Sequence, residues 1–164
     1  MLHFAEDETQ RDIVVTQNDV RQIQLAKAAL YAGIKLLMDK MGVSAVDRIR
    51  LAGAFGSHIS VEHAMVLGLI PDCPLDHVSS AGNAAGVGAR IALLDHGARE
   101  GIQRTVNKAE RIETATETDF QDYFVAAMAI PHKTDPYPNL FSVVERPSPK
   151  LVEQAEGRRR RRRP

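Results

Sequence analysis

The stretch Arg50-Leu51-Ala52-Gly53-Ala54-Phe55-Gly56-Ser57 decides the fold prediction for this chain. A mostly apolar run, Ile49 to Ala52, leads into Gly53 and Gly56, and the polar Ser57 follows. Such a run bounded by glycines is typical of a buried strand that ends in a tight turn. Glycine permits positive φ and lets a flat ligand lie against bare backbone, and open α/β sheets bind ligands at the carboxyl ends of their strands. The stretch therefore indicates either a ligand-binding turn or an ordinary exit from a strand.

Helical and extended patterns alternate along the chain, which is typical of an α/β fold. The extended patterns are few and short, so we expect an incomplete sheet rather than a full doubly wound one. The expected elements are helices over 17–41, 60–67, 83–94, 99–110 and 118–130, strands over 48–52 and 77–81, and an edge strand over 112–115.

The first helix carries the clearest local signals. Thr16 stands three residues before Asp19, as in a capping box with Asp in place of the usual Glu. Gly42 stands where a left-handed C-terminal cap belongs. The apolar residues recur at spacings of three, four or seven, so we expect them to form the inner face of the helix. They are Val20, Ile23, Leu30, Ile34, Leu37 and Met41.

Two polar residues at helical positions have more than one interpretation. Lys27 interrupts the apolar stripe, and its ammonium group either snorkels to solvent or reaches a ribose or phosphate oxygen. Asn83 precedes a run of alanines and glycines, where it is expected to cap a helix and can also contact a ligand. A helix with so few side chains on its first turns can pack very close to another backbone.

Composition limits the classes of protein that remain. The 164 residues suffice for one domain with a core. The single cysteine, Cys73, excludes an intrachain disulfide and any site made only of cysteines, and an exposed thiol is expected there. Apolar runs are too short to span a bilayer, and the N-terminus lacks the order of a signal peptide. We therefore expect a cytoplasmic protein that does not associate with membranes.

The formal charge of zero conceals an acidic body. Six of the 21 basic residues form the run Arg158–Arg163, and the remaining 15 face 21 acidic residues, for a net charge of −6. No aromatic residue interleaves with the arginines, so they offer no stacking platform and we do not expect nucleic acid as a partner. Proline density rises after residue 133. We expect residues 1–133 to form the folded lobe and residues 134–164 to form an extended or disordered tail.

Four stretches together resemble a known family. They are Ile13–Ala29, Leu51–Gly56, Gly82–Ala89 and Asp119–Phe124. In this order and at these distances they are similar to the C-terminal part of the ATP-binding domain of the reductive activators of corrinoid proteins. These activators belong to the superfamily of acetate and sugar kinases, heat-shock chaperones and actin. The resemblance covers about residues 12–131.

The resemblance implies a fold and an activity. The fold would be the C-terminal lobe of an actin-like, ribonuclease H-like ATPase domain, α/β in class and incomplete. A full-length activator uses ATP, with Mg²⁺, to drive electron transfer onto cob(II)amide in a partner corrinoid protein, which restores the cob(I)amide needed for methyl transfer. Its partner is thus a corrinoid protein or methyltransferase. The iron–sulfur cluster of such activators lies in an N-terminal ferredoxin-like domain whose cysteines have no counterpart here.

The resemblance also assigns residues. The adenosine-binding turn corresponds to Gly53–Gly56, the second connecting helix begins at Asn83, and the helix beside the adenosine presents polar side chains at positions 24 and 27. Neither phosphate loop of the superfamily is present. No residue stands out as a general base, a nucleophile or a member of a metal site. The predicted nucleotide contacts are Gln24, Lys27, Gly53, Ala54, Phe55, Gly56 and Asn83.

Two functions remain open from the sequence. The first is a nucleotide-binding lobe of a corrinoid activator that is inactive alone. The second is a non-catalytic interaction or oligomerisation module, including a homodimer, that binds partners through apolar surface exposed by the incomplete fold.

Overall fold

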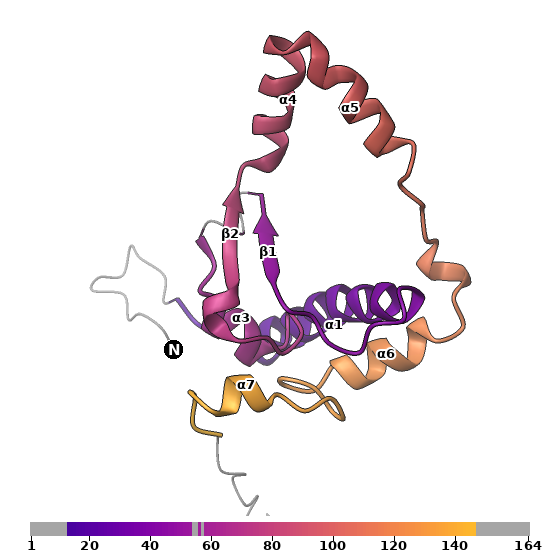
Figure 1. Ribbon diagram of the computed structural model, residues 1–164. Coiled ribbons are helices and arrows are strands. Elements are labelled where there is room, and N and C mark those ends of the chain that lie inside the picture. Colours follow the sequence, from indigo (N-terminus) through magenta and orange to yellow (C-terminus); the bar gives the residue numbers. More distant parts are fainter. Residues whose placement is uncertain (1–12, 54–55, 57, 147–164) are drawn as a thin grey trace, which may run out of the picture.

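The computed structural model describes residues 13–53, 56 and 58–146. Its helices and its two strands alternate along the chain, which confirms the α/β class, and Figure 1 shows their arrangement. Short 3₁₀ turns lie at Leu75–His77 and Thr114–Thr116. The elements are α1 (Gln17–Lys40), β1 (Ile49–Ala52), α3 (Val61–Leu67), β2 (Val78–Gly82), α4 (Ala84–Leu94), α5 (His96–Val106), α6 (Phe120–Ala127) and α7 (Pro138–Phe141).

The body of the molecule is built around α1. Helix α1 passes the amino ends of β1 and β2, and α6 packs beside it (Figure 1). Helices α4 and α5 extend from the carboxyl end of β2 away from this body and are joined by a sharp bend (Figure 1). No helix in the described part of the chain combines the length and apolar character that crossing a bilayer requires.

Local capping explains where three helices begin or end. The expected capping box forms, because Asp19 N–H donates to Thr16 Oγ1 at 3.2 Å and Thr16 N–H donates to Asp19 Oδ2 at 2.8 Å. Ser60 caps α3, and Gly68 ends that helix in the left-handed conformation at φ 72°. Asn83 caps α4 by accepting from Gly86 N–H at 2.9 Å. These four signals were correctly predicted because each joins residues within about one turn.

The core lies where α1, α3, α6, α7 and the amino end of β2 meet. Its members come from distant parts of the sequence and are mostly small or aliphatic, with two tyrosines between them. The fully or nearly fully buried members are Ala28, Tyr31, Ala64, Met65, Ile70, Cys73, Val78, Ala127, Tyr137 and Leu140.

The face of α1 that packs inward is different from the predicted one. Lys27, Tyr31 and Leu36 are buried, whereas Ile23 and Leu30 of the expected stripe are 47% and 50% exposed. The reason is that α6 and the segment after it cover the side of α1 that carries its polar residues and offer those residues hydrogen-bond acceptors. The apolar stripe is left on the adjoining side.

Strands β1 and β2 pair in parallel, with Ile49 opposite Val78 and Leu51 opposite Ser80. The register shifts between Leu51 and Ala52, so Ala52 pairs with Gly82. Parallel strands require a crossover connection, and residues 53–77 supply it through α3. The two strands therefore end at the same edge.

Two expectations for residues 95–115 were wrong. Helix α5 begins at His96, and Gly97 lies inside it, because Asp95 caps this helix by accepting from Ala98 N–H at 3.1 Å. The expected edge strand over 112–115 is a connection that includes a 3₁₀ turn, stabilised by Thr116 donating to the carbonyl of Glu113. This connection runs from α5 back to α6, away from both strands, so it has no strand beside it in the described residues (Figure 1).

Residues 134–146 pack against the body instead of forming the expected extended tail. Tyr137 and Leu140 are buried in the core. Asp72 holds the start of α7, because its carboxylate accepts from the backbone N–H groups of Asn139 at 2.9 Å and Leu140 at 3.0 Å. Residues 147–164, including Arg158–Arg163, lie outside the described residues.

We expect Gly68→Ala to destabilise the chain more than Gly42→Ala does. Both glycines have positive φ, 72° and 67°, so both substitutions carry the backbone cost of about 1–2 kcal/mol. A methyl group at Gly68 would in addition collide with the Pro131 carbonyl oxygen, whereas one at Gly42 would meet nothing within 4 Å. Urea unfolding of both variants measures the difference, and equal losses of stability would contradict the packing described here.

Candidate functional site

The carboxyl ends of β1 and β2 meet in a corner made of backbone. Gly53 N–H donates to Gly82 O at 2.8 Å, and both glycines have positive φ, 98° and 59°. Among the described residues, a Cβ atom added at either position would meet nothing within 4 Å. Within the described part of the chain, the corner thus consists of main chain with no side chain against the two glycines, which is the condition a flat ligand requires.

Helix α4 starts directly from this corner. Asn83 follows Gly82, and its side chain bonds the backbone of Gly86, where any larger residue would crowd the Asn83 amide group. The first turn of α4 contains no acidic residue. The free N–H groups of this turn therefore face no competing carboxylate of their own helix.

The structure brings some of the predicted nucleotide contacts together. Gly53 and Asn83 lie at the same corner, and Gly56 packs so closely on Leu51 that an added Cβ would lie 2.5 Å from the Leu51 carbonyl oxygen. Ala54 and Phe55 lie outside the described residues.

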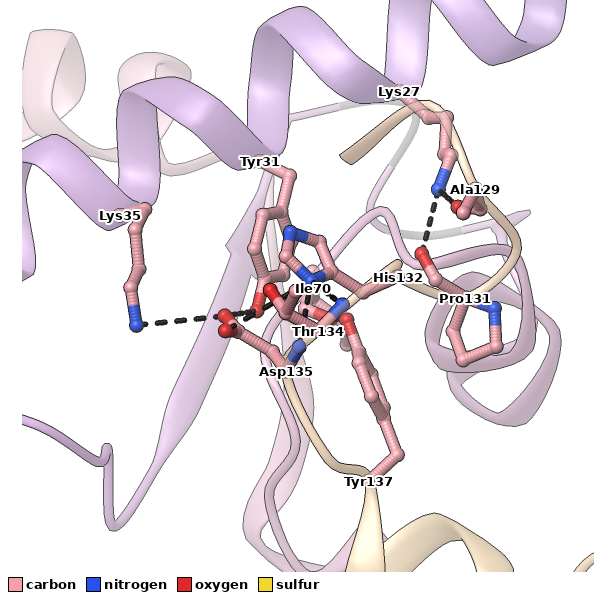
Figure 2. Close-up of polar contacts among 10 residues, drawn as sticks. All are labelled: Lys27, Tyr31, Lys35, Ile70, Ala129, Pro131, His132, Thr134, Asp135 and Tyr137. Atoms are coloured by element: carbon pink, nitrogen blue, oxygen red, sulfur yellow. Dashed lines mark hydrogen bonds and ion pairs between the residues drawn. The ribbon is translucent and has the colours of Figure 1, made fainter. Parts of the chain in front are cut away.

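Gln24 and Lys27 contact a different part of the chain. The Gln24 side-chain amide donates to Met128 O at 3.2 Å. The Lys27 ammonium group donates to Ala129 O and to Pro131 O, the latter at 2.6 Å (Figure 2). A role of these two side chains in nucleotide binding stays a prediction.

The environment of Lys27 is unusual for a lysine. The residue is 0% exposed, and burial lowers the pKa of its ammonium group to about 8. At pH 7 the Lys27 side chain is still protonated in most molecules. Two of the three N–H donors of its ammonium group have carbonyl acceptors. Lysine is almost never fully buried without such partners, so the residue neither snorkels nor stands free.

Two further residues of α1 contact the same C-terminal segment as Gln24 and Lys27. Tyr31 Oη donates to Asp135 Oδ2 at 2.8 Å, and Lys35 Nζ lies 3.4 Å from the same oxygen (Figure 2). The four polar residues of α1 follow one another at spacings of three or four and all meet residues 128–135. We call this set of contacts the polar seam; its α1 members are Gln24, Lys27, Tyr31 and Lys35.

His132 fixes the turn that follows the Lys27 contacts. Its Nδ1 atom accepts from the backbone N–H groups of Thr134 at 3.3 Å and Asp135 at 2.8 Å, so the proton of the neutral ring is on Nε2. Its ring stacks at a tilt on Tyr31, with centroids 4.8 Å apart. Burial lowers the pKa of His132, which keeps Nδ1 free to accept. Protonation of the ring would remove that acceptor.

Sequence reasoning missed the polar seam and misplaced the cysteine. The helical spacing of positions 24, 27, 31 and 35 indicated that these polar side chains lie on one side of α1. Their hydrogen-bond partners, however, lie about 100 residues further along the chain, where spacing gives no signal. Cys73 is fully buried in the core, not exposed as predicted, and burial raises the pKa of its thiol. It therefore acts as a small apolar side chain.

Comparison with known proteins first defines the class of this lobe and then its family. The chain has the fold of part of an ASKHA-type domain. A solved structure described as a reductive activator for corrinoid, iron–sulfur protein has a similar fold, at 35% identity and a TM-score of 0.68. That match covers 74% of this chain and 20% of the other. A model described as the C-terminal domain of RACo, the ASKHA domain, matches residues 1–141. The chain therefore belongs to the family of RACo C-terminal ASKHA domains, as the motifs predicted.

A curated relative points in the same direction. The corrinoid activation enzyme RamQ of Eubacterium limosum is 41% identical over 118 residues, which are 70% of this chain and 20% of RamQ. The chain thus spans about a fifth of the length of each of these two relatives.

We expect Lys27→Met to lower the free energy of unfolding by about 1–3 kcal/mol. The substitution leaves two carbonyl oxygens without their donor, at about 1–3 kcal/mol each, while relief of the desolvated charge offsets part of that loss. Lys35→Met is the matched control, because Lys35 makes a partly exposed ion pair whose loss costs at most about 1 kcal/mol. Denaturant titration measures both, and an equal or larger loss for Lys35→Met would contradict the assigned importance of Lys27.

The stability of the wild-type chain relative to Lys27→Met should rise between pH 8 and pH 10.5. In this range the unfolded lysine, with its ordinary pKa of 10.5, binds more protons than the folded one, whose pKa is about 8. The slope is at most about 1.4 kcal/mol per pH unit. The neutral amine still has two N–H donors for the two carbonyls, so the seam survives deprotonation. A constant difference between the two proteins from pH 7 to pH 10.5 would show that the pKa is not lowered.

Proposed function

We propose that this chain is the C-terminal nucleotide-binding lobe of an ATP-dependent reductive activator of corrinoid proteins. The observation that carries the proposal is the backbone corner. There the Gly53 N–H group donates to the Gly82 carbonyl, both glycines have positive φ, and α4 starts beside them. Membership of the ASKHA family supports a nucleotide as the ligand of this corner.

The proposed ligand is ATP with its adenosine part at the corner. Gly53, Ala54, Phe55 and Gly56 would offer backbone to the base or ribose, and Asn83 would lie at the edge of the site. Neither phosphate loop of the superfamily occurs in the sequence. Phosphate and Mg²⁺ contacts would therefore come from the other lobe of a complete domain, and the chain alone would have little or no ATPase activity.

The names of the relatives support the proposed partner. One is described as an activator for a corrinoid, iron–sulfur protein and the other as a corrinoid activation enzyme. For this chain we propose a corrinoid protein or methyltransferase as the partner and ATP-driven reduction of cob(II)amide to cob(I)amide as the activity of the complete protein in the cytoplasm. The iron–sulfur cluster would belong to another domain.

A second function is supported by exposed apolar side chains on α1, α4 and α5. Leu93 and Leu94, at the bend between α4 and α5, are 73% and 78% exposed. Such surface favours a non-catalytic interaction module or a homodimer. Light scattering distinguishes this alternative, because a strict monomer without partners would contradict it.

Calorimetry with ATP and a nonhydrolysable analogue tests the nucleotide proposal. We expect no binding, or weak binding, by the chain alone, and clear binding when the chain replaces the matched region of RamQ in a single polypeptide. In that chimera Gly53→Val should weaken ATP affinity at least about tenfold, which corresponds to about 1.4 kcal/mol.

Gly42→Val is the matched control, because Gly42 has a similar positive φ and open surroundings but lies at the end of α1. It should lower thermal stability to a similar extent without changing the affinity. A folded chimera that ignores adenine nucleotides would refute the proposal.

A further inference from the structure

One titratable side chain is enclosed where the C-terminal segment meets α1. We use the name C-terminal segment for residues 128–146, which follow α6. The side chain of His132 is only 5% exposed, and its ring stacks on Tyr31 of α1 (Figure 2). Histidine is the side chain that ordinarily changes its charge between pH 5 and pH 8. The segment is thus attached next to a group that responds to mild acid.

The hydrogen bonds of His132 require the neutral ring. Its Nδ1 atom accepts from Asp135 N–H at 2.8 Å and from Thr134 N–H at 3.3 Å. A proton on Nδ1 would turn this acceptor into a third donor that faces two N–H groups. Both backbone donors would then lose their partner, so the charged ring does not fit the turn.

The surroundings of the ring oppose a positive charge. Burial is the largest cause that lowers the pKa of His132, and the ammonium groups of Lys27 and Lys35 act in the same direction. Among the described residues, only the Asp135 carboxylate favours the charged ring, with Oδ1 3.8 Å from Nδ1. That carboxylate already accepts from Tyr31 Oη and pairs with Lys35 through Oδ2. The attached segment therefore holds His132 neutral.

The bonds that hold the C-terminal segment on α1 are concentrated at the same turn. Lys27 donates to two carbonyls of the segment, and Tyr31 donates to Asp135 (Figure 2). Water can solvate a charged His132 only if this turn moves away from α1. Because the bonds lie within a few residues of His132, that movement breaks them together.

Helix α7 follows the turn directly. Tyr137, which precedes α7, is buried and donates to Ile70 O at 3.1 Å. Burial raises the pKa of Tyr137 and of Tyr31, so neither phenol changes its charge in mild acid. His132 is therefore the group at this contact whose charge couples the turn and α7 to pH.

We propose that protonation of His132 releases the C-terminal segment from α1, so that the segment is an acid-sensitive strap on this lobe. The released segment binds more protons than the attached one, because the His132 ring in water has its ordinary pKa of 6.5 and the enclosed ring has a lower pKa. Attachment is thus complete above pH 6.5 and weakens as the pH falls below it, by at most about tenfold per pH unit.

The other charged groups do not produce this dependence. Lys27 is protonated in both states below pH 7, because its pKa is about 8 when attached and 10.5 when free. The proposal is independent of the nucleotide function, since none of its contacts lies at the backbone corner of Gly53 and Gly82.

Hydrogen–deuterium exchange of the full chain at pH 7.0 and pH 5.5 tests the proposal, with rates corrected for the intrinsic effect of pH. Peptides over residues 133–141 report the segment, because bonded amides lie along this stretch. We expect their protection factors to fall about three- to eightfold. Peptides of α1, whose amides are bonded within the helix, should change by less than about twofold.

His132→Asn removes the titration and keeps an acceptor, because an asparagine side-chain oxygen can accept from backbone N–H groups two and three residues on. This variant should protect the segment equally at both pH values, within about twofold. His77→Asn is the matched control, because His77 Nδ1 also lies 2.9 Å from a backbone oxygen but belongs to a half-exposed side chain outside the segment. It should show the same decrease as the wild-type chain.

Four results would overturn the proposal. The first is unchanged protection of the wild-type segment between pH 7.0 and pH 5.5, and the second is an equal decrease in His132→Asn. The third is an equal loss of protection in α1, because acid would then unfold the whole lobe. The fourth is a segment that is unprotected in His132→Asn at pH 7.0, because the two accepted bonds would then not be what holds the turn.

Discussion

The parallel pairing of β1 with β2 is the constraint on which the site depends. It brings two segments that are 29 residues apart, at Gly53 and Gly82, to one edge and joins them by a hydrogen bond of 2.8 Å. Both strands then leave the pairing through glycines at positive φ, a conformation that side chains disfavour. Because α4 starts at this point, its N-terminal amides lie beside the bonded backbone of Gly53 and Gly82. The family match gives this corner its proposed ligand, while the pairing gives it its shape.

Helix α1 organises the body of the lobe at the other end of the strands, and its sides make two kinds of contact (Figure 1). One side forms the polar seam, in which the buried Lys27 ammonium group holds the carbonyls of Ala129 and Pro131 and so ties the C-terminal segment to the core. The adjoining side carries aliphatic side chains such as Ile23 and Leu30, which are 47% and 50% exposed. The directed hydrogen bonds of the seam fix the position of the C-terminal segment, which the aliphatic side could not do.

The sequence was sufficient for features that depend on neighbouring residues. The caps at Thr16, Ser60 and Asn83 were predictable because each bond closes within three residues. The inward face of α1 was not, because Lys27 is buried only by carbonyls 102 and 104 residues further on. The packing of residues 134–146 likewise depends on Asp72, which lies 67 residues from Asn139. Of the candidate site, the adjacency of Gly53 and Asn83 followed from the order of strands and turns, whereas the separate partners of Gln24 and Lys27 could not be derived from spacing alone.

Photoaffinity labelling with 8-azido-ATP tests the central claim most directly, since it reports which residues surround the adenine. The RamQ chimera that contains this chain is irradiated with the probe and digested, and the labelled peptides are identified by mass spectrometry. If the corner holds the base, the label appears within residues 52–58 and 82–87, and unmodified ATP prevents it. Label that ATP displaces only from other peptides, such as those of residues 128–146, would show that the nucleotide lies elsewhere and would contradict the account.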